Sequence, residues 1–242
     1  MGARAAYVML PPDVRSEDVL GYSNRVTDSV SSALEKTRTR YAVALSSIGA
    51  DKKEKTGSVV ALRHFEQKLQ QISGLNLTCL RAGYFIENTL AFVAMLHATG
   101  KTGGPLRAGL KLPMTATRDT GACAADLLLK LSFSGKGTRE LLGQRELDMN
   151  EATAIIGRAT GKPDLEYMHL PPAQVRPGLL QNGVSANMAD LLLEMSDSLN
   201  SGHIRALEKR SPENTTPTSF EAFVEDVFMP LYRGTSRAAQ GD

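Results

Sequence analysis

The sequence has little of several features that define whole classes of protein. Its 242 residues include only two cysteines, Cys79 and Cys123, too few for a disulfide framework and too far apart for a Cys-x-x-Cys metal or redox site. The simple inference is a reducing, cytoplasmic setting. The longest apolar runs are far shorter than the ~20 residues that span a bilayer. Pro11 and Pro12 end the apolar run at residues 5–10 before it could serve as a signal-peptide core.

Charge of one sign is also lacking. The chain has 28 Lys and Arg residues against 26 Asp and Glu residues, which gives a net charge of +2. No strong field of one sign can cover the molecule, so counterion-driven binding to nucleic acid has no support from the composition. Hydrophobic residues make up 42% of the chain, which is enough for a sizeable core and excludes disorder.

Familiar phosphate and metal motifs are absent as well. Only Gly2 and Gly21 precede residue 40, so no G-x-G-x-x-G turn opens the first strand. The run Gly100-Lys-Thr imitates the end of a P-loop, but Met95 stands where its leading glycine belongs. The histidines lack His-Glu-x-x-His spacing, which favours structural or surface roles and no metal site. They are His64, His97, His169 and His203.

The first half of the chain alternates short apolar runs with longer helical patterns. Runs at residues 5–10, 41–45 and 75–80 are typical of buried strands. A helix that Ser16 caps follows the first run, one at residues 59–72 follows the second, and one ending at His97 follows the third. This alternation predicts βαβ crossovers and a parallel sheet covered on both faces, which is an α/β fold.

The second half is predicted to contain shorter elements. A helix covers residues 120–131, and Asp148 with Glu151 forms a capping box for a helix that ends at Gly161. We expect a strand at 164–170 that the prolines at 171 and 172 stop, and a helix at 185–200. Thr218 with Glu221 is expected to cap a last, aromatic-rich helix.

Three loops fall where ligands collect in open α/β sheets, at the carboxyl ends of the strands. They are residues 10–12, 46–49 and 83–88, and they carry hydroxyl, amide or small side chains. The alternative is structural: Ser46 and Ser47 turn the chain, and Asn88 caps a helix. The residues alone leave both interpretations open.

Taken in order, these loops resemble those of the NmrA-like family of atypical short-chain dehydrogenase/reductases. The matching stretches are residues 43–50 (VALSSIGA), 80–88 (LRAGYFIEN), 117–121 (TRDTG), 141–143 (LLG), and 151–157, which contain Glu-Ala and Ile-Ile-Gly. The resemblance covers nearly the whole chain, and the second stretch is the most specific. It implies a partial doubly wound parallel sheet of Rossmann type at residues 1–105. A smaller mixed α/β region for substrate and lid, interleaved with the first, would occupy residues 106–242.

Membership would place an NADP or NAD cofactor and a small-molecule substrate at these loops. Pro11 and Pro12 would border the dinucleotide, Ser46 and Ser47 would lie near the nicotinamide ribose, and three residues would wall the nicotinamide and substrate pocket. Those three are Tyr84, Phe85 and Asn88. Either serine could bond a substrate carbonyl, and Tyr84 is a conceivable proton source, although packing is the better-supported role for that aromatic ring.

The sequence departs from the family at its front. The first apolar run resembles the fourth strand of a complete member, so three strands with the glycine-rich turn are missing from one side of the sheet. We expect an N-terminally truncated product or a mis-started reading frame, or else a shortened protein that completes its exposed edge with a partner or a second copy. Cofactor affinity should be weak or lost, because the pyrophosphate lacks its helix N-terminus.

Three functions remain open at this stage. One is an NAD(P)H-dependent oxidoreductase of quinone-like or carbonyl substrates. A second is a non-catalytic NADP-sensing regulator, which is favoured by the absence of any Tyr-x-x-x-Lys pair. A third is a protein-interaction module that docks partners through its aromatic C-terminal helix, although burial of that helix against its own domain is the default expectation.

Overall fold

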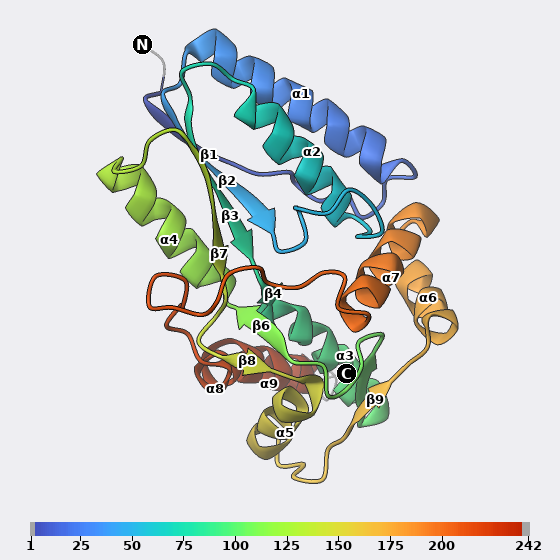
Figure 1. Cartoon of the computed structure of the whole chain (residues 1–242). Coiled ribbons are helices and arrows are strands. Elements are labelled where there is room, and N and C mark those ends of the chain that lie inside the picture. The colour runs from blue at the N-terminus through green and yellow to red at the C-terminus, as the bar shows by residue number, and fades with distance from the viewer. Residues whose placement is uncertain (1–2, 239–242) are drawn as a thin grey trace.

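A four-stranded parallel sheet forms the centre of the molecule. The computed structural model describes residues 3–238. The strands β1 (Ala5–Val8), β2 (Tyr41–Ser47), β3 (Asn76–Ala82) and β7 (Lys136–Leu141) lie in the order β1-β2-β3-β7 (Figure 1). All three neighbouring pairs run parallel, so the carboxyl ends of the strands meet at one edge of the sheet.

Helices cover both faces of this sheet. Helices α1 (Val19–Thr37) and α2 (Val59–Gln70) lie on one face and α4 (Thr117–Lys130) lies on the other (Figure 1). Alternate residues of β2 explain this arrangement, because successive side chains in a strand point to opposite faces. Ala42 and Ala44 pack with Phe65 of α2, whereas Val43 packs with Leu127 of α4. The predicted α/β class and the parallel sheet are confirmed.

Short elements build the rest of the molecule beyond the carboxyl edge of the sheet (Figure 1). Small sheets form from β4 (Tyr84–Phe85), β6 (Leu112–Thr115) and β8 (Glu146–Leu147), and from β5 (Thr102–Gly104) and β9 (Tyr167–His169). The helices are η1 (Ile86–Leu90), α3 (Ala91–Thr99), α5 (Met149–Ala159), α6 (Pro172–Gln181), α7 (Ala186–Asn200), α8 (Phe220–Phe223), the π-helix η2 (Val224–Phe228) and α9 (Met229–Ala238). The region predicted at 106–242 thus adds β7 to the main sheet and places α4 on one of its faces. The division at residue 105 stays a prediction.

Several local expectations are confirmed and others are wrong. The capping box of Asp148 and Glu151 is present, and Gly161 follows the helix with φ +73°. Helix α1, however, is capped by Asp18 and not by Ser16, since the Asp18 carboxylate accepts from the Gly21 amide. Ser219, not Thr218, caps α8.

The aromatic C-terminal helix is part of the core. Phe220, Phe223 and Phe228 are at most 2% exposed and pack against α5 and neighbouring elements. Because these rings are already buried, they offer no docking surface to a partner. The hypothesis of a protein-interaction module rested on this helix and is therefore not supported by it.

Strand β1 lies at the edge of the main sheet, where another chain could add a strand. Tyr7 of β1 is 41% exposed, and Met9, just after this edge strand, is 37% exposed. Whether a partner or a second copy covers this edge stays a prediction.

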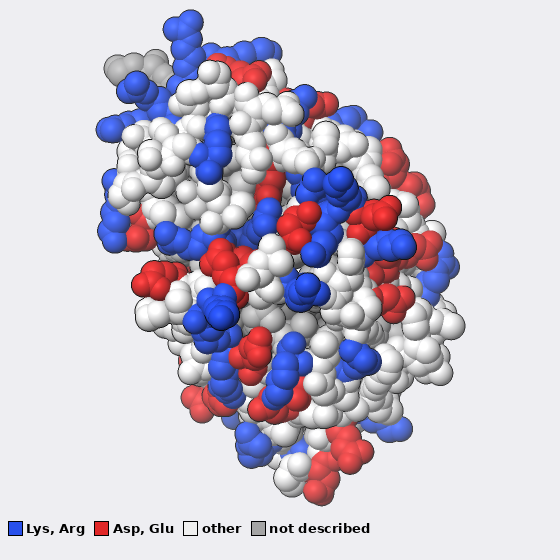
Figure 2. Space-filling view, viewed as in Figure 1, with Lys and Arg blue, Asp and Glu red and all other residues white. Residues whose placement is uncertain are grey.

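Figure 2 shows positive and negative side chains interspersed over the viewed face, in keeping with the small net charge. Within residues 3–238, no helix combines the length and apolar character needed to cross a membrane.

Candidate functional site

A cavity of about 410 Å³ lies at the carboxyl ends of β1, β2 and β3; we call it cavity 1. All seven residues singled out in the sequence line it: Pro11, Pro12, Ser46, Ser47, Tyr84, Phe85 and Asn88. The parallel sheet explains the convergence, since segments that are far apart in the chain all leave strands at the same edge. The structure thus brings the predicted residues together; their roles toward a cofactor remain predictions.

Local backbone chemistry sets the direction of two of these segments. Pro11 and Pro12 cannot donate backbone hydrogen bonds, so β1 ends before them. Gly83 joins β3 to β4, and its amide donates to the Leu141 carbonyl oxygen at 2.9 Å. A Cβ at Gly83 would lie 2.3 Å from the carbonyl oxygen of Pro113, so only glycine lets β4 approach β6 here. This close approach places Tyr84 and Phe85 in the cavity wall.

Ser46 belongs to a buried polar network. Its hydroxyl donates to Oε1 of Glu66 at 2.5 Å, and the Arg81 guanidinium donates to both oxygens of the same carboxylate, at 2.9 and 2.6 Å. Glu66 is 2% exposed, so the carboxylate needs these partners. The bond to Glu66 raises the pKa of Arg81, which keeps the guanidinium charged. The Ser46 proton is therefore committed to Glu66 and not directed to a ligand.

Ser47 points its hydroxyl to the backbone. The hydroxyl donates to the Ile48 carbonyl oxygen at 3.0 Å, and the residue is half-buried. A hydroxyl is also an acceptor with two lone pairs, so Ser47 can still accept a hydrogen bond from a group in cavity 1. Ser46 could accept in the same way but is only 3% exposed, so the half-buried Ser47 is the better placed of the two serines to meet a ligand.

Tyr84 and Asn88 form the polar part of the opposite wall. Burial raises the pKa of the Tyr84 phenol to about 12, and a hydrogen bond with the Asn88 side chain opposes part of that rise. The phenol is therefore neutral at physiological pH and can donate a hydrogen bond. A group with this pKa is a weak general acid near neutrality, because efficient proton donors have a pKa close to the working pH.

Helix α7 closes cavity 1 and was not assigned to the site from sequence. Met188, Met195 and Leu199 line the cavity from this helix. Their apolar spacing predicts an inward helix face but not which cavity it covers. Met side chains adapt to irregular shapes, so this wall suits a flat organic ring.

Side chains of α7 also bond one backbone amide at the start of α1 and one in the loop before α2. Oδ1 of Asn187 accepts from the Val19 amide at 2.9 Å at the start of α1. Oε1 of Glu194 accepts from the Gly57 amide at 3.2 Å just before α2. Backbone amides at helix N-termini are the usual cradle for phosphates, so these two positions are not open to one. Cavity 1 is thus an apolar slot with few polar groups, and the Val19 and Gly57 amides near it are already bonded.

Two further kinds of chemistry could operate at such a site: a cysteine nucleophile and a bound metal ion. Burial, with a smaller contribution from the Glu66 charge, raises the pKa of the Cys79 thiol to about 12, so the thiol stays protonated and inert. Across residues 3–238, no three His, Cys, Asp or Glu side chains group together in a way that could hold a metal ion.

Comparison with known proteins identifies similar reductases. An NAD(P)H azoreductase of Xenophilus azovorans is 25% identical over 130 residues, which are 54% of this chain and 44% of the azoreductase. The match therefore spans less than half of that relative's length.

Solved structures show the same fold. The NADPH-dependent quinone oxidoreductase of Escherichia coli, solved with NADPH, superposes with a TM-score of 0.75 at 21% identity, over 94% of this chain and 77% of that one. The triphenylmethane reductase of Citrobacter sp., solved with NADP(H), gives 0.71 at 14% identity, over 93% and 78%. The fold is thus of Rossmann type. The model of the NmrA-like family matches residues 40–224, and the chain belongs to that family.

Proposed function

We propose that this chain is an NAD(P)H-dependent oxidoreductase that acts on quinone-like or carbonyl substrates in cavity 1. The observation that carries the proposal is the convergence of separate chain segments on one apolar cavity at the carboxyl edge of a parallel sheet. Its family membership and its likeness to NADPH-binding reductases support the same conclusion.

The residues of cavity 1 fit a nicotinamide ring beside a flat substrate. Such a ring, when bound, supplies a hydride, and the protein orients the two reactants and excludes water. Pro11 and Pro12 would border the cofactor, and Ser47 would accept a hydrogen bond from it. The neutral Tyr84 phenol would donate a hydrogen bond to a substrate oxygen, while Phe85 and the α7 methionines would exclude water.

We further propose that dinucleotide affinity is weak. Asn187 and Asp18 take the Val19 and Gly21 amides at the start of α1. Glu194 takes the Gly57 amide in the loop before α2, so these three amides are not open to a pyrophosphate. The ring site therefore lacks the support that helix N-termini give to phosphates. Both cysteines are free, which is consistent with a reducing compartment such as the cytoplasm, and we propose that location.

A non-catalytic NADP sensor is the second candidate. Two observations favour it. The Ser46 proton is committed to Glu66, and burial raises the pKa of Tyr84 to about 12, so neither group is tuned as a proton donor near neutral pH. Binding of the dinucleotide would then change the protein without reaction.

Calorimetric titration with NADPH and NADH tests binding, and oxidation of NADPH in the presence of menadione or a simple aldehyde tests turnover. Asn88→Leu removes the amide at the exposed mouth of cavity 1 and should weaken binding about tenfold. Leu129→Gln, on exposed α4, is the control and should leave binding unchanged.

Binding with turnover supports the oxidoreductase. Binding of NADPH with no oxidation of it by either class of substrate supports the sensor and overturns the enzyme. No heat of binding from either dinucleotide at millimolar concentration would overturn both proposals.

A further inference from the structure

A second cavity, of about 460 Å³, lies beyond the wall of cavity 1; we call it cavity 2. It opens between the start of β6, the loop after β7 and residues 202–210, a segment that we call the strap. Ile48, Leu199 and Ile204 line both cavities and separate them. The recessed centre of the face in Figure 2 lies where the strap crosses in front of the sheet in Figure 1.

The strap brings three cations to cavity 2 that have no carboxylate partner in the part of the chain that the structure describes. Arg205 donates to the Gly202 carbonyl oxygen at 3.2 Å, and Arg210 donates only to backbone carbonyls. The Lys209 ammonium makes no hydrogen bond or ion pair among the described residues, although the backbone carbonyl of Lys209 accepts from the Asn214 side chain. The positive charges of these side chains are therefore uncompensated by direct pairing.

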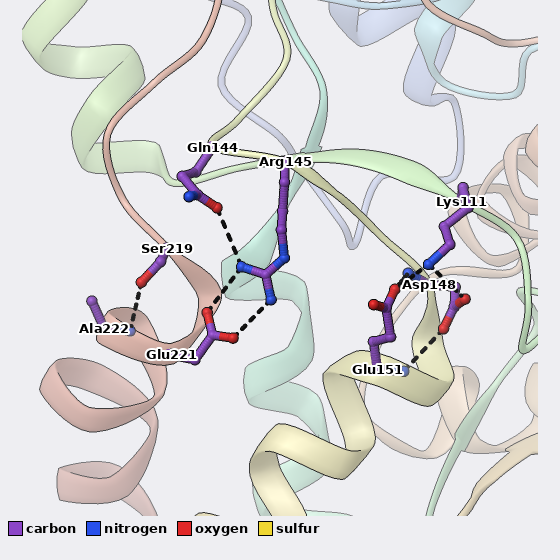
Figure 3. Close-up of polar contacts among 8 residues, drawn as sticks. All are labelled: Lys111, Gln144, Arg145, Asp148, Glu151, Ser219, Glu221 and Ala222. Atoms are coloured by element: carbon purple, nitrogen blue, oxygen red, sulfur yellow. Dashed lines mark hydrogen bonds and ion pairs between the residues drawn. The ribbon is translucent and has the colours of Figure 1, made fainter.

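Lys111, the fourth cation that lines cavity 2, has carboxylate partners. The Lys111 ammonium lies between the carboxylates of Asp148 and Glu151, and Figure 3 shows these two side chains converging on it. Its charge is satisfied within the protein. Lys111 thus closes one end of cavity 2, and the strap cations remain available to a ligand.

Arg210 is held rigidly in place. Its Nη1 and Nη2 atoms donate to the carbonyl oxygens of Gly143 at 2.6 Å and Leu142 at 2.9 Å. Gly143 has φ +71°, and a Cβ there would lie 1.7 Å from the Met114 carbonyl oxygen, so the loop that offers these carbonyls requires glycine. A guanidinium fixed in this way loses little freedom when it binds an anion.

Two carboxylates also line cavity 2, and one of them is already engaged. Oε1 of Glu208 accepts from the Glu140 amide at 3.1 Å, and Oε2 accepts from the Asn214 amide group at 3.2 Å. The other, Glu146, is exposed, and its carboxylate makes no hydrogen bond or ion pair within residues 3–238. Three cations without a carboxylate partner therefore face two carboxylates, of which Glu208 is bonded to neutral amide groups. The floor between them is apolar and is formed by Leu110, Leu112, Pro113, Leu142 and Ala206.

We infer that cavity 2 binds a small organic acid, with its anionic group on the strap cations and its apolar body on the floor. Carboxylate and phosphate groups share this chemistry, because guanidinium and ammonium groups donate charge-assisted hydrogen bonds to both. The inference goes beyond the proposed function and does not depend on it, since cavity 2 is separated from the ring site.

A matched pair of probes tests the inference by calorimetry. 1-Naphthoate and 1-naphthalenemethanol share the same ring body, and 1-naphthyl phosphate replaces the carboxylate by a phosphate. Both anions should bind at least about tenfold more tightly than the neutral alcohol, as expected for hydrogen bonds to charged groups. Stronger binding of the phosphate than of the carboxylate would assign the site to phosphate esters, and the reverse would assign it to carboxylic acids.

Two variants locate the binding. The triple variant Arg205→Gln, Lys209→Gln and Arg210→Gln should remove the preference for the anions. A control with Lys36→Gln, Lys53→Gln and Lys101→Gln changes the net charge equally at exposed positions elsewhere and should keep it. Ala206→Phe should block both anions by filling the floor. Equal affinity for the anions and the alcohol, or an anion preference that survives the strap variant, would overturn the inference. Melting curves by circular dichroism establish that each variant is folded.

Discussion

Two arginine–carboxylate pairs in this molecule share their geometry and differ in their surroundings. Nη2 of Arg81 in β3 lies 2.6 Å from Oε2 of Glu66 in α2, and the two side chains are 12% and 3% exposed. Arg145 and Glu221 meet at 2.7 Å beside α8, with side chains 38% and 45% exposed (Figure 3). Each guanidinium donates two hydrogen bonds to its carboxylate.

Because the geometry of the two pairs is the same, we expect exposure to water to decide how much each pair contributes to the free energy of unfolding. A buried charge that loses its partner keeps its desolvation cost, so the two members of the buried pair depend on each other. An exposed charge that loses its partner is solvated again, so the exposed pair contributes little. The buried pair also fixes the Ser46 hydroxyl beside cavity 1, while the exposed pair only helps to hold α8.

The largest effect is expected from breaking the buried pair. Glu66→Gln leaves the Arg81 charge without its counterion and should lower the free energy of unfolding by about 3–5 kcal/mol. Urea denaturation measures this loss. The double variant Glu66→Leu with Arg81→Met removes both charges and should recover most of the stability. A double variant that is as unstable as the single one would show that packing, and not charge, dominates here.

A smaller effect is expected from a buried carboxylate that has neutral partners. Asp119 of α4 is 7% exposed and accepts from the amide and the hydroxyl of Thr218, at 2.9 and 2.6 Å. Asp119→Ala leaves both donors unpaired and should cost about 2 kcal/mol in urea denaturation. Asp119→Asn keeps one acceptor and is the matched control, with a smaller cost. Equal losses for the two variants would argue against the hydrogen-bond account.

The exposed pair should contribute about 1 kcal/mol or less. Glu221→Gln tests it at neutral pH. Hydrogen bonding to Arg145 lowers the pKa of Glu221, so the stabilisation is present above the ordinary glutamate pKa of about 4.3 and is lost as pH falls through the lower folded-state value. The difference in thermal midpoint between wild type and variant should shrink on acidification. A difference that grows as the pH falls contradicts this sign.

The smallest effect concerns a carboxylate whose shift has the opposite sign. Burial raises the pKa of Glu140, although the amides of Leu207 and Glu208 donate to its carboxylate and oppose the rise. Its favourable contribution is therefore present below the ordinary glutamate pKa and is lost as pH rises through the folded-state value. Glu140→Gln should flatten the fall in wild-type stability just above that range, as seen in thermal melts across pH. An unchanged slope would contradict the assignment.

Much of the fold could be predicted from local pattern. Strands β1, β2 and β3 are apolar runs, and the helices that follow them show the spacing of a buried face. Strand β7 was missed because its first residues are exposed at the sheet edge and its sequence, KGTREL, has no apolar run. Helix α6 was missed because Pro171 and Pro172 signal the end of a strand, yet Pro172 also suits the first position of a helix.

Motifs located the candidate site only in part. The seven residues chosen from the sequence do line one cavity, because parallel strands bring their carboxyl ends together. Glu66, Asn187 and Glu194 were not foreseen. Their partners lie 15 to 168 residues away in the chain, and no local pattern encodes such pairings.

The class of fold, the family and the segments that form the site follow from the order of residues alone, since hydrophobic period, turn residues and motifs are local properties. Which polar groups remain free for a ligand depends on the folded arrangement. Ser46 bonds Glu66, side chains of α7 bond the Val19 and Gly57 amides, and the strap cations have no carboxylate partner among the described residues. The physical reason is that hydrogen-bond and charge satisfaction depend on neighbours in space, which the chain brings together only when it folds.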